Sequence, residues 1–170
     1  MVYRIVKYPD PVLETPASPV VDFGPELEKL VRDMFDTMWA SKGVGLAAPQ
    51  IGLPMRLAII DTSAGEDPSE RLVLVNPEIT FRSGSQTGEE GCLSIPGFRE
   101  NVTRPMIATV RAQDHQGNTF EKTGEELLAR AILHETDHLN GVLFINYLSP
   151  LKRDLIKRKT RKMQKAGEWE

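Results

Sequence analysis

The stretch that decides the fold runs from Thr123 to Gly141 and reads TGEELLARAILHETDHLNG. Its first four residues, TGEE, match a capping box, in which a Thr hydroxyl and a Glu carboxylate three positions later cap each other's backbone N–H groups. Gly141 is a typical residue just beyond a helix end. The stretch therefore predicts a capped helix that ends at about Asn140.

Two histidines on this predicted helix lie one turn apart. His134 and His138 flank Glu135 in an HExxH motif. Because four residues make just over one helical turn, both imidazoles project from one face and can bind one metal ion. The Glu135 carboxylate can then take a proton from water held at that metal. Two unrelated helix histidines are a poor alternative, since the chain has only three His.

Two histidines leave a catalytic metal site one protein ligand short. Metzincin proteases take the third ligand from HExxHxxGxxH, but the position of their last His is Phe144 here. Other zinc proteases use a Glu further downstream, and the only acids there lie in or beyond a basic segment: Asp154, Glu168 and Glu170. The single cysteine, Cys92, offers a thiolate. Cys92 could instead be a buried thiol of the core, but the incomplete HExxH site favours Cys92 as the third metal ligand.

Three segments together resemble the peptide deformylase family. They are Gly43–Gln50 (GVGLAAPQ), Glu90–Ser94 (EGCLS) and His134–His138 (HETDH), and they occur in the order that the family has. The flanking regions are similar over nearly the whole chain. Leu133 departs from the pattern, because members often carry Gln before the first His; we expect it to change a hydrogen bond near the metal and leave the chemistry intact.

The resemblance implies a hydrolase that removes the formyl group from the N-terminal methionine of newly made polypeptides and releases formate. Its metal ligands would be Cys92, His134 and His138. The metal would be one divalent cation, with Fe(II) expected first and Zn, Ni or Co able to replace it. Metal-bound water would attack the formyl carbon, with Glu135 as general base and then as general acid.

Further roles follow from the same resemblance. The side-chain amide of Gln50 and the backbone N–H of Leu93 would stabilise the oxyanion, although Gln50 could simply anchor its loop. Gly45, if it is more than a turn glycine, would let a substrate peptide lie against the backbone as an added strand. Leu127 and Arg130 share the helix face of His134. We expect Leu127 to line the methionine pocket and Arg130 to reach its rim or contact the substrate backbone, although Arg130 could equally be a plain surface arginine. Asp137 is expected to make a structural hydrogen bond.

The rest of the chain predicts an α+β fold, with mostly antiparallel sheet packed around the HExxH helix and a C-terminal helix. One helix should begin at Pro25 and stop at Gly43, followed by an irregular Gly43–Gln50 loop. Four prolines within residues 1–20 predict an extended segment, and residues 142–147 a short extended one. Strands are expected at 55–61, 71–81, 106–114 and 119–123. Segregated strands and helices favour α+β over α/β, and the 170 residues suit one domain, 1–170.

Composition limits the possible partners and location. No apolar run is long enough to span a membrane, and residues 1–11 lack the features of an export or import signal. We therefore expect a cytoplasmic protein without membrane or DNA partners.

Charge is unevenly distributed. Residues 151–170 hold 8 basic and 3 acidic residues, which leaves 13 basic and 21 acidic in residues 1–150. A helix at 148–166 is expected to dock through an apolar stripe: Leu148, Leu151, Leu155, Ile156 and Met163. Its cations could be merely solvated or could contact RNA phosphates. The resemblance implies the second, at the ribosome near the exit tunnel.

Two other functions compete with deformylation. An HExxH zinc endopeptidase would share the helix, but Phe144 leaves it without a third ligand. A non-catalytic metal-containing ribosome-binding module would need neither Glu135 nor Gln50.

Overall fold

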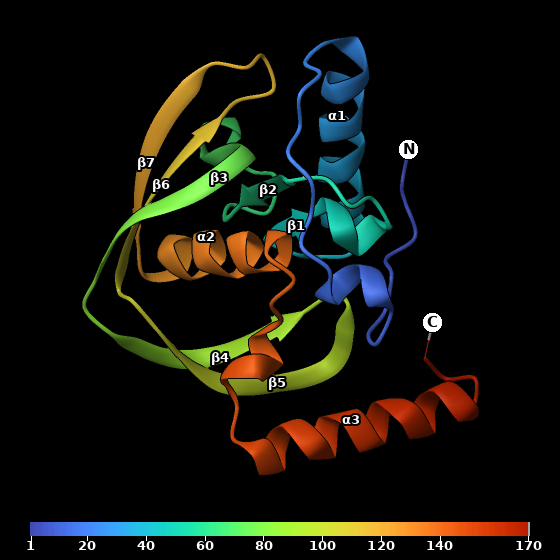
Figure 1. Ribbon diagram of the computed structural model, residues 1–170. Coiled ribbons are helices and arrows are strands. Elements are labelled where there is room, and N and C mark those ends of the chain that lie inside the picture. The colour runs from blue at the N-terminus through green and yellow to red at the C-terminus, as the bar shows by residue number, and fades with distance from the viewer. Residues whose placement is uncertain (170) are drawn as a thin grey trace.

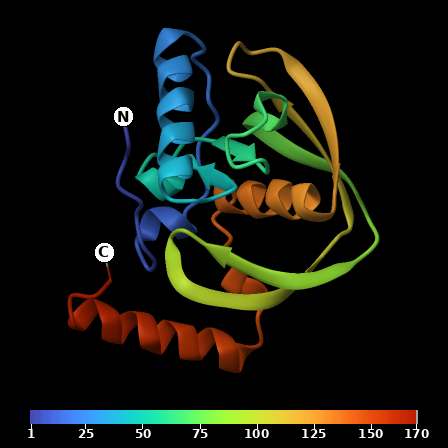
Figure 2. The ribbon, with the colours of Figure 1, turned by 180° about the vertical axis from the view of Figure 1, so that it is seen from behind.

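The computed structural model describes residues 1–169, and its centre is the helix that carries HExxH. Helix α2 (Glu126–Leu139) lies between a five-stranded sheet and a two-stranded ribbon, as both views show (Figure 1, Figure 2). The sheet has the order β1-β2-β3-β6-β7 with every neighbouring pair antiparallel. Its strands are β1 (Gly45–Ala47), β2 (Leu57–Asp61), β3 (Arg71–Ser83), β6 (Ile107–Gln113) and β7 (Thr119–Glu125). The antiparallel α+β fold is confirmed.

The two-stranded ribbon, β4 (Gln86–Cys92) and β5 (Ile95–Arg104), was absent from the sequence-based expectations. The segment 86–92 reads QTGEEGC, so it lacks the alternation of apolar residues that predicts a strand. Its backbone pairs with β5 all the same, and one face of the ribbon covers α2. The ribbon matters for function because Cys92 is its last residue before the turn.

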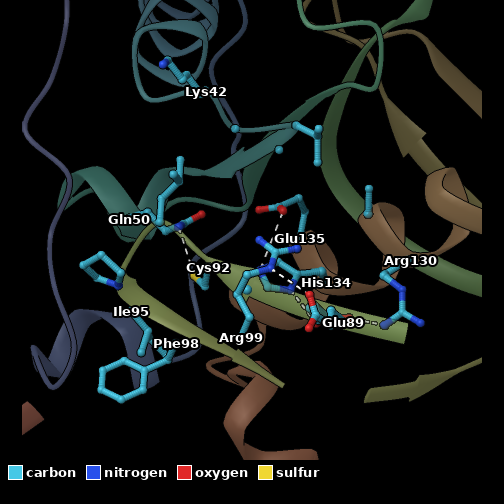
Figure 3. A pocket seen from close by; sticks show the side chains of 18 of the residues that line it. Lys42, Gln50, Glu89, Cys92, Ile95, Phe98, Arg99, Arg130, His134 and Glu135 are labelled. Carbon is cyan, nitrogen blue, oxygen red and sulfur yellow. Dashed lines mark hydrogen bonds and ion pairs between the residues drawn. The ribbon is translucent and has the colours of Figure 1, made fainter. Parts of the chain in front are cut away.

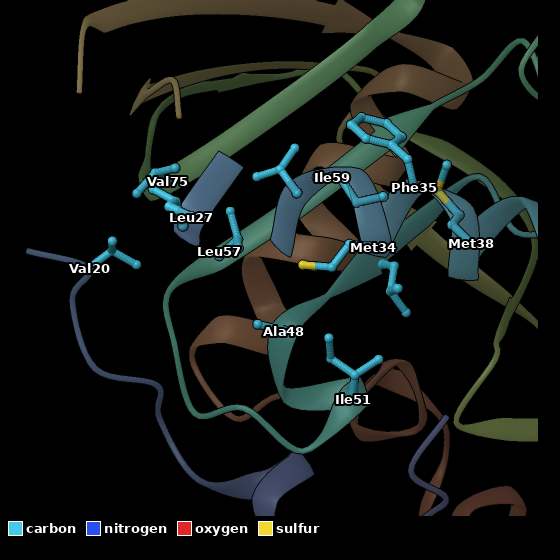
Figure 4. Packing of buried hydrophobic residues seen from close by; sticks show 12 residues of the cluster. Val20, Leu27, Met34, Phe35, Met38, Ala48, Ile51, Leu57, Ile59 and Val75 are labelled. Atoms are coloured by element: carbon cyan, nitrogen blue, oxygen red, sulfur yellow. The ribbon is translucent and has the colours of Figure 1, made fainter. Parts of the chain in front are cut away.

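Helix α1 (Pro25–Ala40) buries one face against β1 and β2 (Figure 4). Pro25 occupies the first turn, as expected, and Met34 and Met38 are fully buried. The expected stop at Gly43 is wrong in detail: the left-handed residue is Lys42, with φ +58°, and the Gly43 N–H donates to the Met38 carbonyl at 3.0 Å. This bonding pattern is a Schellman motif, and it ends the helix before Gly43.

Three other local expectations are wrong. Thr123 belongs to β7, where its hydroxyl lies 2.8 Å from that of Thr109, so no capping box forms and Glu125 becomes the N-cap. The strand ladder holds the chain up to Glu125, and this pairing prevails over the local cap. The Gly43–Gln50 segment contains β1 and a 3-10 turn (Ala48–Ile51), because β2 supplies a partner for its backbone. Residues Phe144–Tyr147 form another 3-10 turn in place of an extended segment.

The C-terminal helix α3 (Pro150–Lys165) begins after Ser149, whose hydroxyl accepts from the Lys152 N–H. Only part of its expected apolar stripe docks. Ile156 is buried, whereas Leu151 is 70% exposed and Leu155 is 43% exposed. Ile156 packs in a cluster that also contains Phe144 and Trp169, and this cluster holds α3 against the ribbon.

Candidate metal centre

The turn after β4 and the helix α2 bring the three predicted ligands together. The Cys92 Sγ lies 3.3 Å from the His138 Nε2, which lies 3.1 Å from the His134 Nε2. All three candidate ligand atoms are within 4.8 Å of one another. Cys92 is partly buried and both histidines are buried, so the group is shielded but reachable from one side.

The chemistry of this donor set fits a divalent metal ion. With metal–ligand bonds of about 2.0–2.3 Å, tetrahedral ligand atoms stand roughly 3.3–3.8 Å apart, close to the 3.3 and 3.1 Å that separate the His138 Nε2 from the Cys92 Sγ and the His134 Nε2. The Nδ1 of His134 lies 2.7 Å from a carboxylate oxygen of Glu90, so this nitrogen donates and the Nε2 lone pair is left for a metal. Two imidazoles and one thiolate suit Fe(II), Zn or Ni and do not suit Mg or Ca.

Glu90 is a functional residue that the sequence reasoning did not assign. Its carboxylate bonds His134 at 2.7 Å, Arg104 at 2.6 and 3.1 Å, and Arg130 at 2.8 Å, and it is only 4% exposed. Burial alone would raise the pKa of Glu90, but hydrogen bonds from His134 and Arg104 hold that pKa well below its usual range. Glu90 therefore stays ionised and orients His134. Its position two residues before Cys92, within a strand, was the one signal available.

The same network extends to the end of α2. Arg104 also donates to Asp137 at 2.7 Å, and the Tyr147 hydroxyl donates to the same Asp137 oxygen at 2.8 Å. The Arg104 guanidinium lies over the Tyr147 ring, 4.7 Å from its centroid. The structural hydrogen bonding expected of Asp137 is thus present. It ties α2 to both β5 and the following 3-10 turn.

Glu135 lies beside the candidate ligands and is only 4% exposed. One of its oxygens is 4.0 Å from the His134 Nε2, and the other has no hydrogen-bond partner among residues 1–169. Burial raises the pKa of Glu135 to about 7, although the neighbouring His134 opposes the shift. A carboxyl with a pKa near neutrality can both accept and return a proton.

Gln50 contacts the cluster at Cys92. Its Nε2 is 3.5 Å from the Cys92 Sγ and 3.2 Å from the Ser94 Oγ, while its Oε1 accepts from the Ala47 N–H at 2.9 Å. The bond to Ala47 fixes the amide so that its N–H₂ group faces the site. Leu93 follows Cys92 directly and lines the same cavity.

The cluster opens into a cavity of about 560 Å³ whose walls come from the segment after α1, β1, β4, β5 and α2 (Figure 3). Gly45, Leu127 and Arg130 all line it, together with Gln50, Leu93 and Glu135. Leu127 is 51% exposed and lies toward the opening. A Cβ on Gly45 would come within 2.5 Å of the Glu135 Oε2, so glycine is required for Glu135 to sit where it does.

Arg130 is not the plain surface arginine that the sequence allowed. It is 8% exposed, and besides Glu90 it donates to the Val102 carbonyl at 3.1 Å. Its guanidinium is therefore bonded into the network around His134, although the residue also lines the cavity. Leu133 packs with Ala108 and Ala129, away from the metal face.

The comparisons with known proteins agree with this geometry. The sequence matches the polypeptide deformylase family over residues 2–154. The chain belongs to this family. It is 60% identical to the peptide deformylase of Acidobacterium capsulatum, with 99% of each sequence covered.

Solved deformylase structures have the same fold. A deformylase from Legionella pneumophila superposes with a TM-score of 0.92 at 46% identity, covering 100% of this chain and 99% of that one. A deformylase from Thermus thermophilus gives a TM-score of 0.88 at 43% identity, covering 95% of each chain. Family membership makes the chain a metal-dependent hydrolase, and it does not favour the endopeptidase or the non-catalytic module. Within residues 1–169, no helix is both long and apolar enough to cross a membrane.

Proposed function

We propose that this deformylase removes the formyl group from the N-terminal methionine of nascent polypeptides, with Cys92, His134 and His138 holding one divalent metal. The observation that carries the proposal is the convergence of a three-ligand cluster, a buried carboxyl and a fixed amide on one cavity. When bound, the metal would polarise the formyl oxygen and lower the pKa of water in the site.

The protein groups then account for the proton transfers. Glu135 takes a proton from the attacking water, and a C–O bond forms at the formyl carbon. The negative charge that develops on the formyl oxygen is met by the Gln50 Nε2 and the Leu93 N–H; one such donor can lower the barrier by roughly 3–4 kcal/mol. Glu135 returns the proton to the leaving nitrogen as the C–N bond breaks, which releases formate and a free amino terminus.

The substrate roles of Gly45, Leu127 and Arg130 are part of this proposal. Gly43 and Gly45 line the cavity without side chains, which supports an extended peptide lying beside their backbone. Leu127 and the stem of Arg130 supply apolar surface for the methionine side chain. Steric crowding near Cys92 and Leu93 would exclude acyl groups larger than formyl.

Product identification tests the proposal against the endopeptidase alternative. Formyl-Met-Ala-Ser is incubated with protein purified without oxygen and loaded with Fe(II) or Ni(II), and the products are identified by mass spectrometry. The proposal predicts intact Met-Ala-Ser; Ala-Ser would instead indicate peptide-bond cleavage. Metal analysis of the same preparation tests the expectation that Fe(II) is the native ion.

We propose further that the protein acts in the cytoplasm as one domain, and that α3 contacts ribosomal RNA near the exit tunnel. The supporting features are its 8 cations within residues 151–170 and the exposure of most of them. Because Ile156 and Trp169 help to hold α3, charge reversal is a better test than deletion. A Lys157→Glu, Lys159→Glu, Lys162→Glu variant should lose ribosome co-sedimentation at low salt but keep its activity on peptides. Unchanged co-sedimentation would refute this partner.

A further inference from the structure

The mouth of the catalytic cavity carries positive charge that the residues lining it do not fully compensate. Three exposed charged residues line the cavity at this mouth: Lys42, two residues after α1, Arg99 on β5 and the acid Glu89 on β4. Lys42 is exposed and makes no ion pair within the described chain, residues 1–169. Arg99 meets Glu89 at 3.6 Å, with their side chains 64% and 67% exposed, so this pair is weak. Two cations thus face one acid.

This charge contrasts with that of its surroundings. Deeper in the cavity, Arg130 is bonded to Glu90 and contributes little net charge to the opening. Residues 1–150 as a whole are acidic, with 13 basic and 21 acidic residues. The cationic mouth is therefore a local feature that general surface composition does not explain.

The direction of a bound peptide follows from β1. This strand is the edge of its sheet, and its chain runs from Gly45 beside Glu135 toward Gln50 beside Cys92. A peptide whose formyl group lies at Cys92 and whose backbone extends along this edge must run the opposite way, from Gln50 past Gly45 and on to Lys42. Figure 3 shows Lys42 at the α1 end of the site, beyond the Gln50 and Cys92 side chains.

The reach of the peptide places its third and fourth residues near Lys42. Lys42 lies three residues before Gly45, so the two are at most about 10 Å apart, a distance that roughly three extended peptide residues after methionine can span. The opposite wall is formed by Arg99, whose Nη1 lies 3.2 Å from where a Cβ on Gly91 would stand. The backbone of Lys42 is fixed by the Schellman motif, since its N–H donates to the Trp39 carbonyl at 3.1 Å.

We infer that this enzyme selects nascent chains with acidic residues at the third and fourth positions, and that Lys42 is the main determinant of this selectivity, assisted by Arg99. The inference rests on the proposed deformylase function and specifies its substrates. Exposed charges interact weakly and are screened by salt, so kcat/KM should differ by about three- to tenfold between acidic and basic peptides at low ionic strength.

Three amide-capped peptides test the inference: formyl-Met-Ala-Glu-Glu, formyl-Met-Ala-Ser-Ser and formyl-Met-Ala-Lys-Lys. The metal-loaded enzyme should rank them in that order, and the ratio of acidic to basic should shrink in high salt. Lys42→Gln should reduce the ratio, and Lys42→Glu should bring it to one or below. Lys122→Glu is the matched control, because Lys122 is exposed on β7 and does not line the cavity; its ratio should equal that of the wild type.

The outcomes separate the inference from the function on which it rests. Equal kcat/KM for the three peptides in the wild type, or a Lys42→Glu ratio equal to the wild-type ratio, would overturn the inference and leave deformylation standing. A ratio that falls equally in Lys122→Glu would also overturn it, because net charge would then explain the effect. Hydrolysis of none of the peptides would overturn both.

Discussion

At the scale of single residues, Glu90 connects the metal centre to the surrounding structure. Replacing it with Gln removes the charge that compensates Arg104 and Arg130 and weakens the acceptor for His134. We expect metal affinity to fall about 10- to 100-fold. Unfolding free energy should fall by about 3–5 kcal/mol, because buried Arg130 loses its carboxylate partner and Arg104 keeps only Asp137.

Glu89→Gln is the matched control for this prediction. Glu89 is the adjacent residue in β4, but its side chain is 67% exposed and meets only Arg99, at 3.6 Å. Metal titration and urea denaturation should distinguish the two variants. Equal effects of Glu89→Gln and Glu90→Gln on metal affinity would contradict the role given to Glu90.

Gly45 allows a second prediction at this scale. In Gly45→Ala the new methyl group would meet the Glu135 Oε2 at 2.5 Å, so the carboxylate must move. A displacement of about 1 Å can lower kcat about 100-fold. The metal content should stay unchanged. Gly24→Ala serves as the control, since nothing lies within 4 Å of its Cβ position. Wild-type kcat in Gly45→Ala would refute the requirement for close packing at Glu135.

At the scale of elements, the sequence could predict helices whose residue pattern is visible within the element itself. The apolar periodicity of α1 and the ligand spacing on α2 both predicted real helices. Elements stabilised by distant partners were missed: β1 needs β2, and the polar β4 needs β5. The capping box failed for the same reason, because Thr123 is paired with β6. The cluster of Cys92, His134 and His138 could nevertheless be predicted, because metal-ligand chemistry depends on residue type more than on strand pairing.

Helix α3 provides an element-scale prediction. Ile156 is 4% exposed and packs in the C-terminal cluster, whereas Leu151 is 70% exposed. Ile156→Ala should lower the unfolding free energy by about 2–5 kcal/mol, and Leu151→Ala should change it by less than about 0.5 kcal/mol. Denaturant titration of both variants measures this difference. Similar losses would mean that both halves of the predicted stripe dock, in conflict with the packing described.

At the scale of the whole molecule, the proposed metal ligands join two parts of the fold. Cys92 comes from the β4–β5 ribbon and the two histidines from α2, so a bound ion ties the ribbon to the helix. An ion that binds only the folded state adds about 2.7 kcal/mol at a hundredfold excess over its Kd. Adding Ni(II) to metal-free protein should therefore raise Tm by several degrees. The same addition to Cys92→Ala should raise Tm much less; an equal rise would exclude Cys92 as a ligand.

The most direct test of the central claim is formate release from formyl-Met-Ala-Ser by anaerobically purified, Fe(II)-loaded protein, measured beside Glu135→Ala with equal metal content. We predict turnover by the wild type and a loss of about 10²- to 10⁴-fold in the variant, because the metal is retained and the proton carrier is gone. Absence of formate from the metal-loaded wild type, or equal rates in the two proteins, would contradict the deformylase mechanism built around Glu135.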